Sequence, residues 1–145
     1  MIGLLQRVSS ASVQAGGREI AVIGAGLLVL VGVQKDDGEL QAERLLERLL
    51  SYRVFPDAEG KMNLSVRDVQ GALLLVPQFT LAADTASGTR AGFSTAAEPA
   101  RARTLFGHLV AKARASWPQV GAGEFGADMK VALVNEGPVT FWLES

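Results

Sequence analysis

The stretch Leu27–Val33 (LLVLVGV) decides the fold, because it is a continuous aliphatic run with one glycine and no charged residue. Such a run is typical of a β-strand that is covered on both faces. Gly71–Val76 (GALLLV) repeats the pattern and predicts a second, strongly buried strand. The sequence then turns polar at Pro77–Leu81 (PQFTL). We therefore expect a buried strand that ends in a Gln amide and a Thr hydroxyl.

Shorter strands separated by glycine turns are predicted on either side of these two runs. Gly16-Gly17 is a hairpin signal between the first strand and its return. The expected strands are Ile2–Val8 with its continuation Ser9–Val13 past a bend, Ile20–Ile23, Met129–Val134 and Val139–Leu143, the last two joined by a turn at 135–138.

Two segments have the apolar spacing of an amphipathic helix. The first runs from about residue 38 to 52, and Asp36 with Glu39 predicts a capping box at its start. The second covers Glu98–Trp117, with a proline in its first turn and another directly after it. The small, polar residues 82–95 between them are expected to form a long surface loop.

The order of these elements indicates the fold class. Strands outnumber helices, and the strict alternation of strand and helix that builds a doubly wound parallel sheet is missing. Mixed or antiparallel β-sheets with two outer helices fit the order better, which is an α+β fold. The length of 145 residues predicts a single domain over residues 1–145.

Composition excludes several classes of function. The chain has 14 Lys and Arg against 15 Asp and Glu, a net charge of −1, which argues against gripping nucleic acid through bulk positive charge. A local contact with one end of an RNA stays open. Cysteine is absent, so thiolate nucleophiles, disulfides and cysteine zinc sites are excluded. No apolar run approaches the ~20 residues of a membrane helix, so a cytoplasmic protein without a membrane partner is expected.

Titratable residues offer no obvious acid–base machinery. The single histidine, His108, shares the polar face of the second helix with Arg101 and Lys112, so we interpret it as a solvated residue whose protonation those cations disfavour. A metal site is not expected, because no second histidine exists. Arg103 and Arg114, eleven residues apart, form a second row along that helix, either a solvated face or a ridge that contacts phosphate.

Two polar segments are candidates for function. Pro77–Leu81 places Gln and Thr side chains at a strand end, where they could form part of a polar pocket or simply a strand end. Asn135–Thr140 (NEGPVT) contains Gly-Pro between strands, which marks a fixed turn and leaves a cis bond possible.

Together with their spacing, these motifs resemble the D-aminoacyl-tRNA deacylase family. QFTL and NxGPVT at this separation are highly specific, and the resemblance covers essentially the whole chain. The matching stretches are Met1–Val8, Gly24–Val33, Lys35–Asp37, Asp57–Leu64, Gln78–Asp84, Phe125–Met129 and Asn135–Leu143.

The resemblance implies a fold, an activity and a set of site residues. It implies sheets that close towards a barrel, and an enzyme that hydrolyses the ester of D-aminoacyl-tRNA, and of mischarged glycyl-tRNA, in translation quality control. It implies no cofactor and no metal. It also implies a homodimer with shared active sites, in which a cis Gly-Pro element enters the partner's site and excludes L side chains. The residues implied are Gln78, Phe79 and Thr80 as catalytic, and Arg7, Phe125, Met129, Gly137 and Pro138 as substrate-binding.

The mechanism stays open at the residue level. Thr80 is the obvious nucleophile, yet no general base is recognisable beside it. We therefore expect the terminal ribose 2′-hydroxyl of the tRNA, or water positioned by it, to assist the attack. Pro77 departs from the serine with which the family's first motif usually begins. Alternatives are a protein that binds tRNA acceptor ends without hydrolysis, and an esterase acting on small D-aminoacyl compounds.

Overall fold

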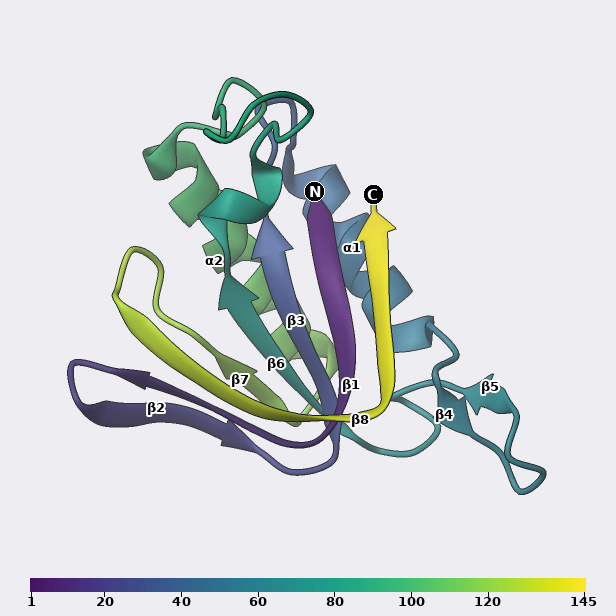
Figure 1. The fold of residues 1–145 in the computed structure, drawn as a ribbon. Coiled ribbons are helices and arrows are strands. Elements are labelled where there is room, and N and C mark those ends of the chain that lie inside the picture. Colours follow the sequence, from purple (N-terminus) through teal and green to yellow (C-terminus); the bar gives the residue numbers. More distant parts are fainter.

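A six-stranded mixed β-sheet carries two helices on one of its faces (Figure 1). The computed structural model describes residues 1–145. Strands run in the order β2-β1-β3-β6-β7, and β8 pairs with β1. Pairs β3–β6 and β6–β7 are parallel and the others are antiparallel, which confirms the predicted α+β class. The strands are β1 (Ile2–Ala15), β2 (Arg18–Ile23), β3 (Gly26–Gly32), β6 (Ala72–Pro77), β7 (Val120–Ala122) and β8 (Met129–Glu144).

The long strands β1 and β8 give the sheet its curl. They pair along almost their whole lengths, from Ile2 opposite Glu144 to Ala15 opposite Met129. The first half of β1 also pairs with β3, whereas its second half pairs with β2. The lower part of the sheet therefore turns away from the upper part, and the sheet closes towards a barrel (Figure 1).

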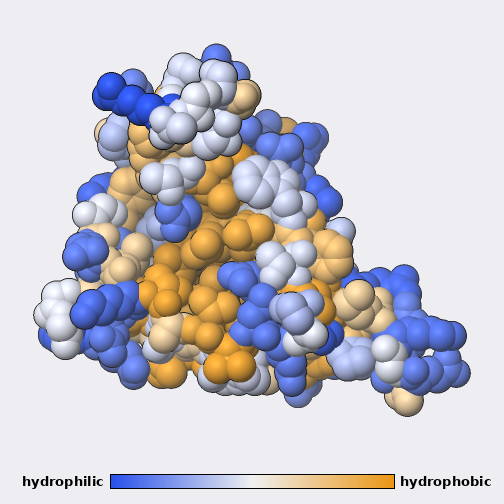
Figure 2. Space-filling view, viewed as in Figure 1, coloured by the Kyte–Doolittle hydropathy of each residue, from blue (hydrophilic) through white to orange (hydrophobic).

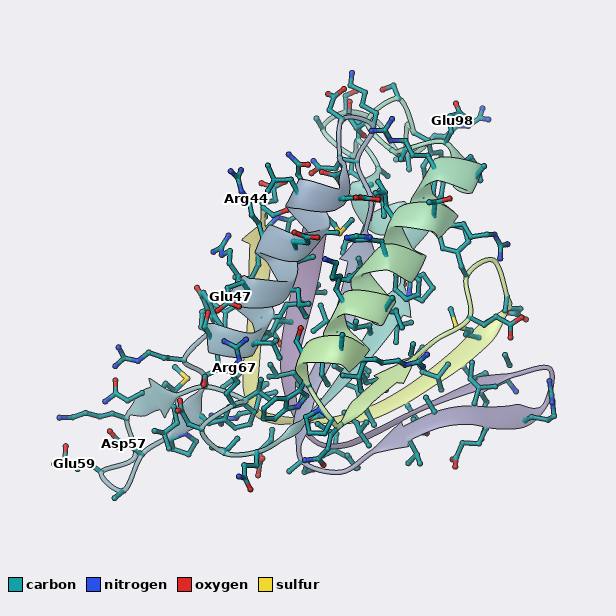
Figure 3. The ribbon with its side chains drawn as sticks, turned by 180° about the vertical axis from the view of Figure 1, so that it is seen from behind. Arg44, Glu47, Asp57, Glu59, Arg67 and Glu98 are labelled. Atoms are coloured by element: carbon teal, nitrogen blue, oxygen red, sulfur yellow. The ribbon has the colours of Figure 1, made fainter.

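The helices α1 (Glu39–Ser51) and α2 (Pro99–Ser116) cover the back of the upper sheet (Figure 3). Their inward side chains, such as Leu45 and Leu109, are fully buried against Leu27, Val29 and others of β3. Each buried aliphatic side chain contributes about 1.5–3 kcal/mol of transfer free energy. Neither helix is both long enough and apolar enough for a membrane span.

The face of the sheet opposite the helices is apolar and partly open. Trp142, Leu4, Leu30 and Val76 form one row across β8, β1, β3 and β6, because they are partners in register. Trp142 at the end of this row is 52% exposed. Figure 2 shows this side of the molecule, where hydrophobic residues form a continuous surface.

The predicted capping box at the start of α1 was wrong. The N-cap of α1 is Gly38, not Asp36, and its N–H donates to the side-chain oxygen of Gln41 at 3.0 Å. The neighbouring Asp37 is buried, and its carboxylate accepts hydrogen bonds from the Met1 ammonium at 2.5 Å and from the Gln34 N–H at 2.6 Å, which compensate for its burial. The capping prediction considered only local spacing, whereas a contact with the distant N-terminus fixes this turn.

The predicted pair of closing strands is one strand, β8, which pairs with β1 on both sides of the Gly-Pro segment. Between α1 and β6 the chain forms a small hairpin, β4 (Phe55–Pro56) with β5 (Met62–Leu64). This hairpin projects from the body of the molecule, with Asp57 and Glu59 at its tip (Figure 3). Close by, Arg67 pairs with Glu47 of α1 at 2.9 Å.

Candidate active site

The polar end of β6 brings Gln78 and Thr80 together. The strand ends at Pro77, and Phe79–Ala82 form a short 3₁₀ helix, η1. The Gln78 side-chain amide donates to Thr80 Oγ1 at 2.6 Å. An amide N–H cannot accept a proton, so this contact orients the hydroxyl without acting as a general base. The Gln78 amide is the side-chain hydrogen-bond partner of the Thr80 hydroxyl.

Pro77 fits the end of β6 without the loss of a ladder hydrogen bond. The Gln78 N–H donates to the Val31 carbonyl at 2.8 Å, so the N–H of residue 77 would point away from β3. On that side β7 has already ended, and the Pro77 ring instead lies beside the backbone of Gly123. The missing donor is therefore one that the sheet does not need.

An apolar pocket of about 330 Å³ lies next to this strand end. It brings together Phe79, Phe125 and Met129, three of the residues that the family resemblance implied. No titratable side chain lines it, and its aromatic and proline surfaces suit a flat, uncharged group. Its walls are Pro77, Phe79, Pro99, Phe125, Gly126, Ala127 and Met129.

The loop that follows η1 contributes an aromatic residue that sequence reasoning missed. Phe93 stacks on Phe79, with ring centroids 5.0 Å apart and planes at 22°. Asp84 and Gly92 exchange two backbone hydrogen bonds, of 2.8 and 2.9 Å, which close the loop that carries Phe93. The available signal was the single aromatic residue in a segment of small polar residues.

The Gly137-Pro138 element lies in a bulge of β8. Between the pairs Gln6–Thr140 and Val8–Asn135, β1 advances two residues while β8 advances five. The intervening residues leave the sheet, and Glu136, Gly137 and Pro138 are exposed. The peptide bond before Pro138 is cis.

Side-chain hydrogen bonds hold this bulge. Arg7 donates through Nε to the Glu136 carbonyl at 3.2 Å and through Nη1 to the Val54 carbonyl at 2.6 Å. Across the base of the bulge, the Asn135 amide donates to Thr140 Oγ1 at 2.8 Å. Gly137 has φ +124°, and a Cβ there would lie 2.7 Å from a Val139 methyl group. Only glycine fits this position.

Within this chain, the bulge and the pocket lie far apart. The bulge lies opposite Arg7, whose β3 partner is Leu27, whereas Pro77 is the partner of Val31. The two features are therefore four residues apart along β3 and three strands apart across the sheet, roughly 13 Å by 14 Å. Figure 1 shows the same separation, with η1 at the top and the bend of β8 at the bottom. The predicted site residues thus form two groups.

The predicted surroundings of His108 were wrong. Its ring nitrogens face the carboxylates of Glu43, at 3.2 Å, and Glu39, at 3.7 Å, and its side chain is only 20% exposed. The prediction considered only the cations of α2 and not the acidic face of α1 opposite. Hydrogen bonds from Lys112 and then from His108 hold the pKa of the Glu43 carboxyl below its usual range, and the pKa of Lys112 is raised by the same contact.

The matching family model, described as "D-Tyr-tRNA(Tyr) deacylase", covers residues 4–144. The chain belongs to this family. A "D-aminoacyl-tRNA deacylase" of Alkalilimnicola ehrlichii is 61% identical over 145 residues, which are 100% of this chain and 97% of that protein. Another, of Pseudomonas aeruginosa strain UCBPP-PA14, is also 61% identical, with 100% of both chains covered. Membership confirms the resemblance that QFTL and NxGPVT carried.

Two solved structures share the fold of this chain. A protein described as "c-Myc DNA Unwinding Element Binding Protein" superposes with a TM-score of 0.95 at 36% identity, covering 100% of this chain and 99% of that one. A "probable eukaryotic D-amino acid tRNA deacylase" has a TM-score of 0.86 at 16% identity, covering 99% and 98%. The second match supports the fold alone.

Proposed function

We propose that this chain hydrolyses the ester bond between a D-amino acid and the 3′ end of tRNA, in the cytoplasm, and thereby removes mischarged residues before translation. Membership of the deacylase family makes it a hydrolase. The observation that carries the assignment is the apolar pocket directly beside the Gln78–Thr80 pair. A pocket of that size suits the terminal adenosine, and the strand end next to it can hold the ester.

The active site is completed by a second copy of the chain. In one protomer the Gly137-Pro138 bulge and the pocket are too far apart to act on one ester. The bulge is exposed, and Arg7 and Asn135 hold it in one conformation. The open apolar row that ends in Trp142 supplies surface for such an assembly (Figure 2). In the homodimer, the bulge of one subunit enters the partner's site.

Rejection of L-amino acids follows from this arrangement. The bulge presents main chain to the α-carbon of the substrate, once the ammonium and the ester carbonyl are both held. A D side chain then points to open space, glycine has no side chain to clash, and an L side chain meets backbone. Selectivity by a clash discriminates more strongly than the loss of a favourable contact.

The chemical step is the attack of water on the ester carbonyl, assisted by the terminal ribose. The first N–H groups of η1, those of Phe79 and Thr80, have no acceptor within the helix and stabilise the developing oxyanion. Thr80 positions the reacting groups, and the 2′-hydroxyl of the ribose assists removal of the water proton. The bond from the carbonyl carbon to the 3′ oxygen breaks, and that oxygen leaves with a proton as the free hydroxyl of tRNA.

The test is a deacylation assay on matched D-aminoacyl-, L-aminoacyl- and glycyl-tRNA, with the wild type and Pro77→Ser. We expect rapid hydrolysis of the D and glycyl esters and little of the L ester, with EDTA present or absent. Bound but intact D-aminoacyl-tRNA would instead identify a protein that only binds acceptor ends. Equal cleavage of a D-aminoacyl ester without RNA would identify a general esterase.

A further inference from the structure

Arg103 is a cation without a partner at the edge of the apolar pocket. Its guanidinium carbon lies 5.1 Å from the centroid of the Phe125 ring. A Cβ built on Gly126 would lie 3.1 Å from one of its terminal nitrogens, so the guanidinium also rests against the backbone of the pocket loop. Phe125 and Gly126 both line the pocket. The charge is thus fixed at the pocket, although no charged side chain lies inside it.

Two of the other three cations of α2 have partners. Arg101 donates to the Asp37 carbonyl, and Lys112 pairs with Glu43 at 2.9 Å. Arg103 forms neither an ion pair nor a hydrogen bond, although Glu124 lies on the same loop as Phe125 and Glu98 at the outer end of α2 (Figure 3). Five N–H donors of a guanidinium therefore remain free beside an apolar cavity.

An aromatic pocket next to a free guanidinium is complementary to a nucleotide. Stacking on rings such as Phe79 and Phe125 suits a base, and the planar donor fork of arginine matches two oxygens of a phosphate. The two binding features are adjacent, as a base and its own 5′-phosphate are, with only the ribose between them.

We propose that Arg103 binds the phosphate on the 5′ side of the terminal nucleotide, so that the site recognises a nucleotide and not a nucleoside. This inference rests on the proposed function, which places the terminal adenosine in the pocket. It assigns a contact through which a protein of net charge −1 holds RNA locally.

Arg114 supplies a matched control. It lies eleven residues further along α2, about 16 Å away, and is also exposed and unpaired. It lines a different pocket, together with Val120 and Gly121 of β7, and does not line the pocket of Phe79 and Phe125. Arg114→Ala therefore removes the same charge from the same helix without touching the proposed contact.

The test compares two ligands that differ by a single phosphate. These are the non-hydrolysable 3′-(D-tyrosylamino)-3′-deoxyadenosine and its 5′-monophosphate, titrated directly so that binding does not depend on activity. We expect the wild type to bind the phosphorylated ligand about tenfold more tightly, the size of a charge-assisted hydrogen bond. Arg103→Ala should bind both ligands equally, Arg103→Lys should keep part of the preference, and Arg114→Ala should keep all of it.

A purely structural role for Arg103 predicts another pattern. If the guanidinium only supports Phe125, Arg103→Ala lowers the affinity for both ligands by the same factor. The wild type then binds the two ligands equally tightly, with or without the phosphate. Either result, or the absence of binding by both ligands, overturns the inference. Hydrolysis of D-aminoacyl-tRNA by the wild type in the separate deacylation assay would leave the proposed function standing in each case.

Discussion

Single residues set the geometry on which the site depends, and Gly137 is the clearest of them. Its φ of +124° is a region that L side chains rarely adopt, and a Cβ would also meet Val139 and the Arg7 guanidinium at 2.7 and 3.1 Å. Arg7 in turn ties the bulge to Val54, so a displaced guanidinium would release two segments together. A Cβ added at Gly137 would therefore disturb the conformation of the whole bulge.

We expect Gly137→Ala to destabilise the protein by about 3 kcal/mol, because backbone strain and overpacking add. Denaturant unfolding of the variant would measure this. Gly16→Ala is the matched control, since Gly16 also has positive φ, +57°, but nothing lies within 4 Å of its Cβ position. It should cost only about 1 kcal/mol. Equal losses in the two variants would show that contacts at Gly137 contribute nothing.

Thr80 allows a residue-scale test of the mechanism. Because its hydroxyl is held only by the Gln78 amide, we expect Thr80→Ala to slow single-turnover deacylation about tenfold without abolishing it. A tRNA that ends in 2′-deoxyadenosine should lose more activity than this. An acyl adduct on Thr80 in mass spectra, or full activity on the deoxy substrate, would contradict the assisted mechanism.

At the scale of elements, local patterns predicted what local physics decides. The aliphatic run Leu27–Val33 and the apolar spacing of both helices gave strands and helices close to those observed. The PQFTL motif predicted Gln and Thr side chains at a strand end, and the structure adds the hydrogen bond between them. Contacts between residues far apart in the sequence could not be predicted from local patterns. Asp37 binds the Met1 ammonium, and Phe93 stacks on Phe79. The strand β8 continues through its bulge because β1 pairs with it on both sides.

The contact between α1 and α2 should make stability depend on pH. The pKa of Glu43 is lowered from 4.5 in the folded state by Lys112 and His108, so the stabilisation it brings is present above pH 4.5 and is lost as pH falls further. We expect the melting temperature of Glu43→Gln to fall less than that of the wild type below pH 4.5. Thermal unfolding between pH 3 and 7 measures this.

Glu59→Gln is the control for that series, because Glu59 lies on the exposed hairpin and pairs only with Lys61. The melting temperature of Glu59→Gln should fall below pH 4.5 by as much as that of the wild type. Parallel curves for Glu43→Gln and the wild type would show that the helix contact makes no difference to acid stability.

At the scale of the whole molecule, the proposed homodimer would bring the two groups of site residues together, and a mixing experiment tests that directly. A chain with Gly137→Ala keeps its pocket but loses its bulge, and a chain with Gln78→Ala and Thr80→Ala keeps its bulge but loses its polar strand end. In a mixed dimer, the intact bulge faces the intact pocket in one of the two sites. Co-refolding equal amounts of the two defective chains should therefore restore about a quarter of the wild-type deacylation rate, since about half of randomly formed dimers are mixed.

A chain that carries all three substitutions, refolded with the wild type, gives mixed dimers without any intact site. Mixtures no more active than the average of their parents would mean that each subunit works with its own bulge, and the shared site would be wrong.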